Sequence, residues 1–246
     1  MEIDLWGAAG VPVKLALYAA SFLSAGAALF LVVYGERSGV LRAGLTRTVV
    51  IGAIVAAAAS VAFIAIQAGM LAGAGIAGMA DPAMMSLLWG TQAGDAIILR
   101  LVGLALLIVS VATPRPLFTV LTTIGAIAVA TSFALVGHAK DAGGLWLQGL
   151  ITLHLLAVAF WIGALWPLRA AARGRLELGH ASELAECFGR LAAWAVPGLA
   201  VAGAITAATL LKTPSAIFEG AYGLVLTLKV AAFLALLSLA ALNKLR

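Results

Sequence analysis

Seven long runs of apolar residues alternate with short polar segments along this chain. The runs cover residues 11–34, 46–71, 94–112, 116–136, 146–168, 188–211 and 221–243. Each is close to or longer than the ~20 residues that an α-helix needs to cross the hydrocarbon core of a bilayer. No run alternates strictly between apolar and polar residues, as the strands of outer-membrane barrels do. The pattern therefore predicts an all-α, polytopic membrane bundle of about seven transmembrane helices.

Composition and loop length support a membrane protein with a single domain. The chain is 64% hydrophobic and only 10% charged, whereas soluble domains carry about 25% charged residues. The polar segments are short, so we expect one transmembrane domain that spans residues 1–246. Two segments stand out, a loop rich in Gly and Met at 72–93 and a basic loop at 169–190. Neither a nucleotide-binding motif nor a catalytic constellation is found, so the sequence does not predict an enzyme.

The distribution of basic residues predicts the orientation in the membrane. Ten of the fifteen Lys and Arg residues fall on one side of the predicted bundle: Arg37, Arg42, Arg47, Arg115, Arg169, Arg173, Arg175, Arg190, Lys244 and Arg246. Short cytoplasmic loops are enriched in Lys and Arg. This side is therefore expected to be cytoplasmic, which places the N-terminus and loop 72–93 outside and the C-terminus inside.

Three ionisable residues lie clearly inside the predicted spans, away from their ends: Arg100, His154 and Lys229. Inserting a charged side chain into the bilayer costs about 2.5–3.5 kcal/mol on insertion scales, so such residues usually face the interior of a bundle or a wet cavity. All three lie at a similar depth below the outer ends of their helices, which predicts one polar cavity open to the outside. The alternative is that Arg100 and Lys229 snorkel outward to the membrane surface.

Two histidines are placed to meet near the outer surface. His138 ends the fourth apolar run and His154 lies in the fifth, so an antiparallel hairpin of these two helices would bring the imidazoles together. Two imidazoles from facing helices suit half of a copper site or the axial ligation of a haem. Chance proximity is the alternative, because a pair of histidines is a weak signal.

Methionines concentrate in and beside the outer loop, where Met79, Met84 and Met85 lie. Thioethers are soft ligands that suit Cu(I), although methionine also fills irregular gaps in apolar packing. Asp81 followed by Pro82 has the pattern of a helix N-cap and a first-turn proline. This pattern predicts a short helix that carries Met84 and Met85.

Residues at seven-residue intervals share helix faces in two of the spans. Tyr222 and Lys229 share a face of the last span, and His154 and Trp161 share a face of the fifth, because seven residues make nearly two full turns. We therefore place Tyr222 and Trp161 beside the ionisable residues of the predicted cavity.

Four motifs in order resemble the copper resistance protein D family. They are Thr91-x-x-Gly94-x5-Arg100, Gly137-His138-Ala139, the stretch from His154 through Trp161 to Gly163, and Tyr222-Gly223-x5-Lys229 continuing to Asn243. The resemblance covers about residues 91–246. Family members usually continue into an eighth span, whereas this sequence ends at Arg246. We expect either a shorter variant or a part of a longer chain.

The resemblance implies a protein of the bacterial inner membrane that handles copper and imports it. It also implies a periplasmic copper-binding partner of the copper resistance C type. The family's metal ligands correspond to His138 and His154 here. Arg100 and Lys229 also match the family pattern, without an implied role.

We therefore expect copper to be taken from the periplasmic side and passed across the membrane. The methionine loop would capture the ion, the two histidines would coordinate it, and Arg100 and Lys229 would shape the electric field. One alternative is a b-type haem protein, with His138 and His154 as axial ligands and the two cations on the haem propionates. Another alternative is a membrane module that assists metalloprotein assembly without transporting anything.

Overall fold

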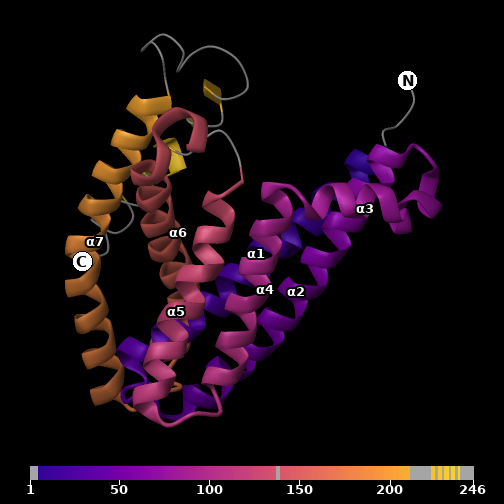
Figure 1. Cartoon of the computed structure of the whole chain (residues 1–246). Helices are drawn as coiled ribbons and strands as arrows, with labels where there is room; N and C mark the ends of the chain where they lie inside the picture. Colours follow the sequence, from indigo (N-terminus) through magenta and orange to yellow (C-terminus); the bar gives the residue numbers. More distant parts are fainter. Residues whose placement is uncertain are drawn as a thin grey trace. The chain divides into compact units, whose positions relative to one another are not determined.

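A computed structural model describes residues 5–136 and 139–210 and a few positions between 223 and 238. Its α-helices are α1 (Leu5–Tyr34), α2 (Arg42–Ala72), α3 (Pro82–Trp89), α4 (Gln92–Ser110), α5 (Arg115–Ala134), α6 (Ala139–Ala172) and α7 (Leu178–Leu210), with short 3-10 helices at Gly39–Leu41 and Gly75–Ala80 (Figure 1). No strand occurs in the described part of the chain. The predicted all-α polytopic fold is confirmed. The seventh apolar run, 221–243, lies largely outside the described residues, and the orientation in the membrane stays a prediction.

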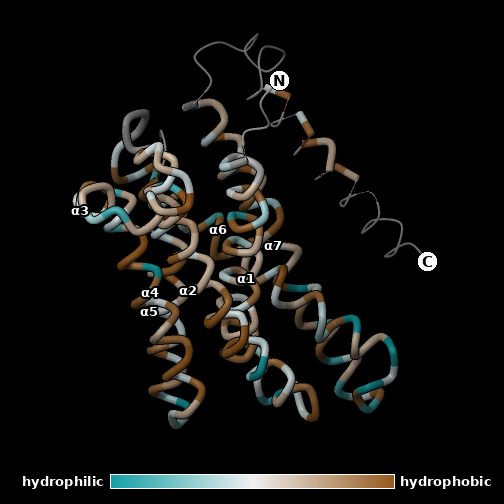
Figure 2. The backbone as a smooth tube through the Cα atoms, turned by 90° about the vertical axis from the view of Figure 1, so that its right-hand side faces the viewer, coloured by the Kyte–Doolittle hydropathy of each residue, from teal (hydrophilic) through white to brown (hydrophobic). Residues whose placement is uncertain are grey.

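The first six predicted runs coincide with six helices that are long and apolar enough to cross a membrane. These are Ala9–Tyr34, Gly39–Ala72, Gln92–Ser110, Arg115–Ala134, Gly144–Ala172 and Leu178–Thr209. The largest difference concerns segment 169–190, where α6 continues to Ala172 and α7 already begins at Leu178. The first turns of α7 are hydrophilic (Figure 2). A helix that extends beyond its apolar run carries charges there, so hydropathy alone marks the extension as a loop.

The predicted outer loop is helical over much of its length. The side chain of Asp81 accepts a hydrogen bond of 2.9 Å from the backbone N–H of Met84, and Pro82 is the first residue of α3. This confirms the predicted N-cap and the short helix that carries Met84 and Met85. Figure 1 shows α3 at one end of the bundle, which we call the α3 end. The opposite end, where Arg169 lies in the last turn of α6, is called the arginine-rich end.

Helix α1 is the centre of the first compact unit, Met1–Ala202. It packs against α2, α4, α5 and α6. Its backbone touches that of α6, because a Cβ atom on Gly26 would lie 1.8 Å from the carbonyl oxygen of Ala159. The hydroxyl of Ser24 donates a 2.8 Å hydrogen bond to the carbonyl of Val49 and joins α1 to α2. Small residues and interhelical hydrogen bonds of this kind hold helices together in membranes.

The second compact unit, Gly203–Arg246, contains the last turns of α7 and the helical turns described between 223 and 238. Arg100, His154 and the three methionines of the outer loop all belong to the first unit.

Candidate functional site

A close approach of two glycines sets the distance between α4 and α5. A Cβ atom on Gly103 would lie 2.8 Å from the carbonyl oxygen of Gly125, and the reverse substitution meets the carbonyl of Gly103 at the same distance. The helices are therefore in backbone contact at this level. One turn closer to the α3 end, α4 presents Arg100, and two turns from Gly125, α5 presents Ser132. The glycine contact brings these two side chains within reach of each other.

Arg100 is buried between α4 and α5 and points into the bundle. The residue is only 5% exposed, so its side chain does not snorkel outward. The Nε atom donates a 3.0 Å hydrogen bond to the hydroxyl of Ser132, which in turn donates to the carbonyl of Val129 at 2.6 Å. The guanidinium carbon lies 4.1 Å from the centre of the Phe133 ring. Within the described residues no carboxylate forms an ion pair with Arg100.

Aromatic side chains from α1 complete the surroundings of this arginine. The ring of Tyr18 lies 4.5 Å from that of Phe133, and the ring of Phe22 lies 5.3 Å from it. Stacking of a guanidinium on an aromatic face stabilises the cation most where water is excluded. The charge of Arg100 is therefore buried in an aromatic environment. Its partners are the ring of Phe133 and the hydroxyl of Ser132, and no carboxylate of the described residues pairs with it.

Further polar side chains lie on the neighbouring helices. Thr131, beside Ser132 on α5, meets Thr152 of α6 with their hydroxyl oxygens 3.5 Å apart. The hydroxyl of Ser21 on α1 and the amide nitrogen of Gln148 on α6 are buried and form no hydrogen bond with the described protein atoms. Buried polar atoms are normally hydrogen-bonded, so these two are polar positions inside the bundle.

His154 lies half-buried on α6, on a different face from Thr152. The helical period separates residues two positions apart by about 200°, so His154 faces away from the contact with α5. It shares its face with Trp161, whose ring contacts that of Phe188 on α7 at 5.3 Å, edge to face. The imidazole therefore belongs to the side of α6 that faces α7, whereas Arg100 belongs to the junction of α4 and α5. A cavity shared by Arg100 and His154 stays a prediction.

Three of the predicted site residues fall outside the described part of the chain. They are His138, Tyr222 and Lys229. The pairing of His138 with His154 and the depth of Lys229 accordingly stay predictions. The described residues hold no group of three or more His, Cys, Asp or Glu that would bind a metal ion.

The methionines of the outer loop lie in apolar surroundings. Met84 and Met85 pack against a small core cluster that contains Ile64 and Leu88. Met79 lies beside α2, where a Cβ atom on Gly69 would come 3.0 Å from its Cγ atom. These contacts fit the gap-filling role of methionine, and their role as copper ligands stays a prediction.

Sequence reasoning missed the partners of Arg100. Ser132, Phe133 and Tyr18 lie on other helices, and no local pattern connects them to Arg100. The polar residues inside the apolar runs could have indicated these contacts, because Ser132 and Gln148 both lie within predicted membrane spans. A polar residue that interrupts a membrane span usually faces the bundle interior.

Two family models match this chain. The model described as copper resistance protein D-like, N-terminal domain, matches residues 6–149, and the model described as copper resistance protein D matches residues 182–246. The first match includes Arg100 and its partners, whereas His154 and Trp161 lie in the segment between the two matches. No curated protein and no solved structure matches the chain.

Proposed function

Because the chain belongs to the copper resistance protein D family, we propose that it takes copper from the periplasmic side of the bacterial inner membrane and passes it across. The family makes it a multi-pass membrane protein of copper resistance. Copper binding by this chain and the inward direction of transport are what we propose in addition.

The observation that carries the proposal is the position of His154. An imidazole is held half-buried inside a membrane-length helix, Gly144–Ala172, and imidazole nitrogens are good copper ligands. His138 follows the end of α5 at Ala134 and precedes the non-helical Gly144 in α6. In the sequence, His138 lies between α5 and the helical part of α6 that carries His154, and we assign both histidines as ligands of the transported ion.

The placement of Arg100 sets an electrostatic cost for this path. A positive charge about 10 Å from Cu(I) would repel it by about 1.7 kcal/mol at an effective dielectric constant of 20. Arg100, however, is enclosed by Ser132 and Phe133 between α4 and α5, while His154 faces α7. The packed body of α6 between the two sites does not screen this repulsion, so the ligands of the copper ion would have to outweigh it.

The remaining residues complete the proposed path. Met79, Met84 and Met85 would receive copper at the α3 end, from a periplasmic carrier of the copper resistance C type. Trp161 shares the face of His154 and would shield the ion from lipid. Tyr222 and Lys229 of the last span stay predicted site residues.

Haem and assembly roles are the alternatives to be tested against copper. A haem between His138 and His154 would use the same two imidazoles, but the family favours copper as the ligand. A non-transporting assembly module would bind no metal in fixed proportion. Both alternatives predict measurable differences in the purified protein.

The test is the copper content and absorption spectrum of detergent-purified protein, compared between the parent chain and two variants. His154→Ala removes the proposed ligand. His180→Ala is the control, because His180 is exposed at the arginine-rich end and pairs with Glu177 at 3.6 Å. Loss of groups that merely orient ligands costs about 10–100-fold in metal affinity, so loss of a ligand should cost at least as much.

We expect copper bound to the parent and to His180→Ala, and little copper on His154→Ala. An unchanged copper affinity in His154→Ala would contradict the proposal. A strong haem absorption band with stoichiometric iron would replace copper by the haem alternative. The absence of any bound metal in all three proteins would favour the assembly module.

A further inference from the structure

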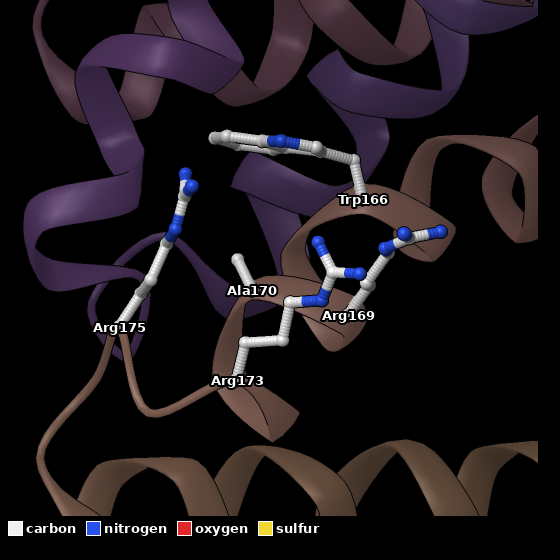
Figure 3. A pocket seen from close by; sticks show the side chains of 5 residues that line it. All are labelled: Trp166, Arg169, Ala170, Arg173 and Arg175. Atoms are coloured by element: carbon white, nitrogen blue, oxygen red, sulfur yellow. The ribbon is translucent and has the colours of Figure 1, made fainter.

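Three arginines surround one hollow where α6 ends. Arg169, Arg173 and Arg175 line a cavity of about 70 Å³ together with Trp166 and Ala170 (Figure 3). We call this set of five residues the arginine hollow. Figure 3 shows Ala170 between Arg175 on one side and the other two arginines on the other, with the indole of Trp166 above them.

The backbone is built to bring Arg175 back to the helix. Gly174 has a φ of 72°, in the left-handed region. Its N–H donates to the carbonyl of Ala171 at 3.0 Å, and the N–H of Arg175 donates to the carbonyl of Ala170 at 3.1 Å. These two bonds form a Schellman motif, the usual glycine-terminated end of a helix. The motif folds the chain back, so that Arg175 lies opposite Arg169 and Arg173 instead of continuing away from them.

The wall of the hollow formed by Trp166 is fixed by α2. A Cβ atom on Gly44 would lie 2.5 Å from the ring of Trp166, so the indole occupies the space that a side chain on α2 would take. Trp166 is 41% exposed and Leu165 is 58% exposed. Leu165, Arg169 and Arg173 follow one another at four-residue intervals and therefore share a stripe on the helix surface. The stripe therefore changes from an apolar side chain at Leu165 to guanidinium groups at Arg169 and Arg173. Such a change occurs where a helix passes from the acyl chains to the headgroups of a membrane.

The acidic residues of this end are engaged elsewhere. Glu36 pairs with Arg115, Glu177 with His180, Glu183 with Arg37 and Glu186 with Arg190. Arg169, Arg173 and Arg175 are exposed and form no ion pair with any described carboxylate. Three like charges around one hollow repel each other, and an anion placed between them would relieve that repulsion.

From this geometry we propose that the arginine hollow binds the phosphate group of an anionic phospholipid. The planar guanidinium fork matches phosphate oxygens two at a time. The cavity is partly open and is lined by all three arginines, so a phosphate group that enters it can reach guanidinium groups on both sides. The exposed apolar side chains of Leu165 and Trp166 beside the hollow supply the contact for an acyl chain, which a free phosphate ion does not need. Basic pockets at the cytoplasmic ends of membrane helices bind lipid headgroups in this way.

Orientation alone does not require this arrangement. The positive-inside rule counts Lys and Arg in a loop and is indifferent to where their side chains point. It therefore needs neither the left-handed turn at Gly174 nor the space that Gly44 leaves for Trp166. A lipid site would use the position of Arg175 opposite Arg169 and Arg173, with Ala170 and Trp166 between them.

The test is lipid retention by the full chain, measured by native mass spectrometry in detergent with phosphatidylglycerol or phosphatidylcholine added at 150 mM salt. The site variant replaces Arg169, Arg173 and Arg175 by Gln. The control variant replaces Arg42, Arg47 and Arg190 by Gln and removes the same charge from the same end. The control residues do not line the cavity, so a general surface field would lower retention equally in both variants, whereas a built site would lower it in the site variant alone.

We expect the parent and the control to retain one phosphatidylglycerol, and the site variant to retain roughly a hundredfold less, because each arginine near an anionic headgroup contributes about fivefold. Phosphatidylcholine should not be retained by any of the three. Equal losses in both variants would overturn the proposal in favour of a general surface field. Displacement of the lipid by millimolar inorganic phosphate would reassign the hollow to a soluble anion.

A fourth variant separates geometry from charge. Gly174→Ala keeps all the arginines but disfavours the left-handed turn that positions Arg175. We expect it to retain less phosphatidylglycerol than the parent at unchanged net charge. Retention equal to that of the parent would show that the fold of the hollow is irrelevant and would overturn the proposal as well. Circular dichroism and monodispersity of each variant confirm that it is folded.

Discussion

One buried arginine and a cluster of three exposed arginines have opposite surroundings in this protein. Arg100 is 5% exposed and is held by a hydroxyl and an aromatic ring between α4 and α5. Arg169, Arg173 and Arg175 are exposed at the end of α6 and lack a described carboxylate partner. Charge alone therefore does not define the role of an arginine in a membrane protein.

The difference shows how packing determines what a cation can do. Around Arg100 the helices touch through their backbones at Gly103 and Gly125, so the guanidinium is fixed and its interactions are internal. At the end of α6 a cavity is left open between the arginines, so the interactions are available to a ligand. We expect the first group to contribute to stability and the second group to binding.

The largest expected effect comes from breaking the close contact of α4 and α5. In Gly103→Val the new side chain meets the carbonyl oxygen of Gly125 and the side chains of Val129 and Ala128 at 3.0 Å or less. Overpacking of this kind costs about 1–3 kcal/mol, and more where the obstacle is backbone. Gly149→Val is the matched control, because nothing lies within 4 Å of its Cβ position. Thermal unfolding in detergent should show a much lower midpoint for the first variant only.

A smaller effect is expected from the partners of Arg100. We predict that Arg100→Met and Ser132→Ala are coupled in a double-mutant cycle. Once the guanidinium is removed, the Ser132 hydroxyl no longer accepts its hydrogen bond, so Ser132→Ala should then cost less free energy of unfolding. Polar contacts between membrane helices average about 0.6 kcal/mol, with a maximum near 1.7, and a charged partner should lie in the upper part of that range.

The hydroxyl pair of Thr122 and Ser110, 3.1 Å apart between the same two helices, supplies an uncharged control cycle. Reversible unfolding in mixed micelles gives both coupling energies. Equal couplings in the two cycles would show that the charge of Arg100 adds nothing to this interface.

The smallest effect on stability is expected in the arginine hollow. Arg173→Gln removes an exposed side chain without an ion-pair partner among the described residues, and such surface changes usually stay within about 0.5 kcal/mol. The unfolding midpoint should match that of the parent, even though lipid retention falls. A large destabilisation would mean that Arg173 has a structural role like that of Arg100.

Much of the fold could be predicted from the sequence, because bilayer thickness fixes helix length. The first six apolar runs and the cap formed by Asp81 and Pro82 are local signals, and the structure contains both. Segment 169–190 could not be placed by hydropathy, since the polar first turns of α7 are helical but lie beyond the apolar run.

The candidate site was less predictable, because its contacts join different helices. The equal depth of Arg100 and His154 suggested one shared cavity, yet depth says nothing about the direction in which a side chain points. Thr152 faces α5, and the helical period then turns His154 toward the other side of α6. The pairing of Arg100 with Ser132 and Phe133 depends on the crossing of α4 and α5 at Gly103, which no sequence period reveals.

The central claim is that His138 and His154 form one copper site, and a four-protein comparison tests it most directly. Copper affinity, measured by chelator competition, is compared among the parent, His138→Ala, His154→Ala and the double variant. Ligands of one ion act as a unit, so their losses are not additive. We predict that either single substitution removes most of the binding and that the double variant is little worse. Small losses that add up in the double variant would contradict a shared copper site.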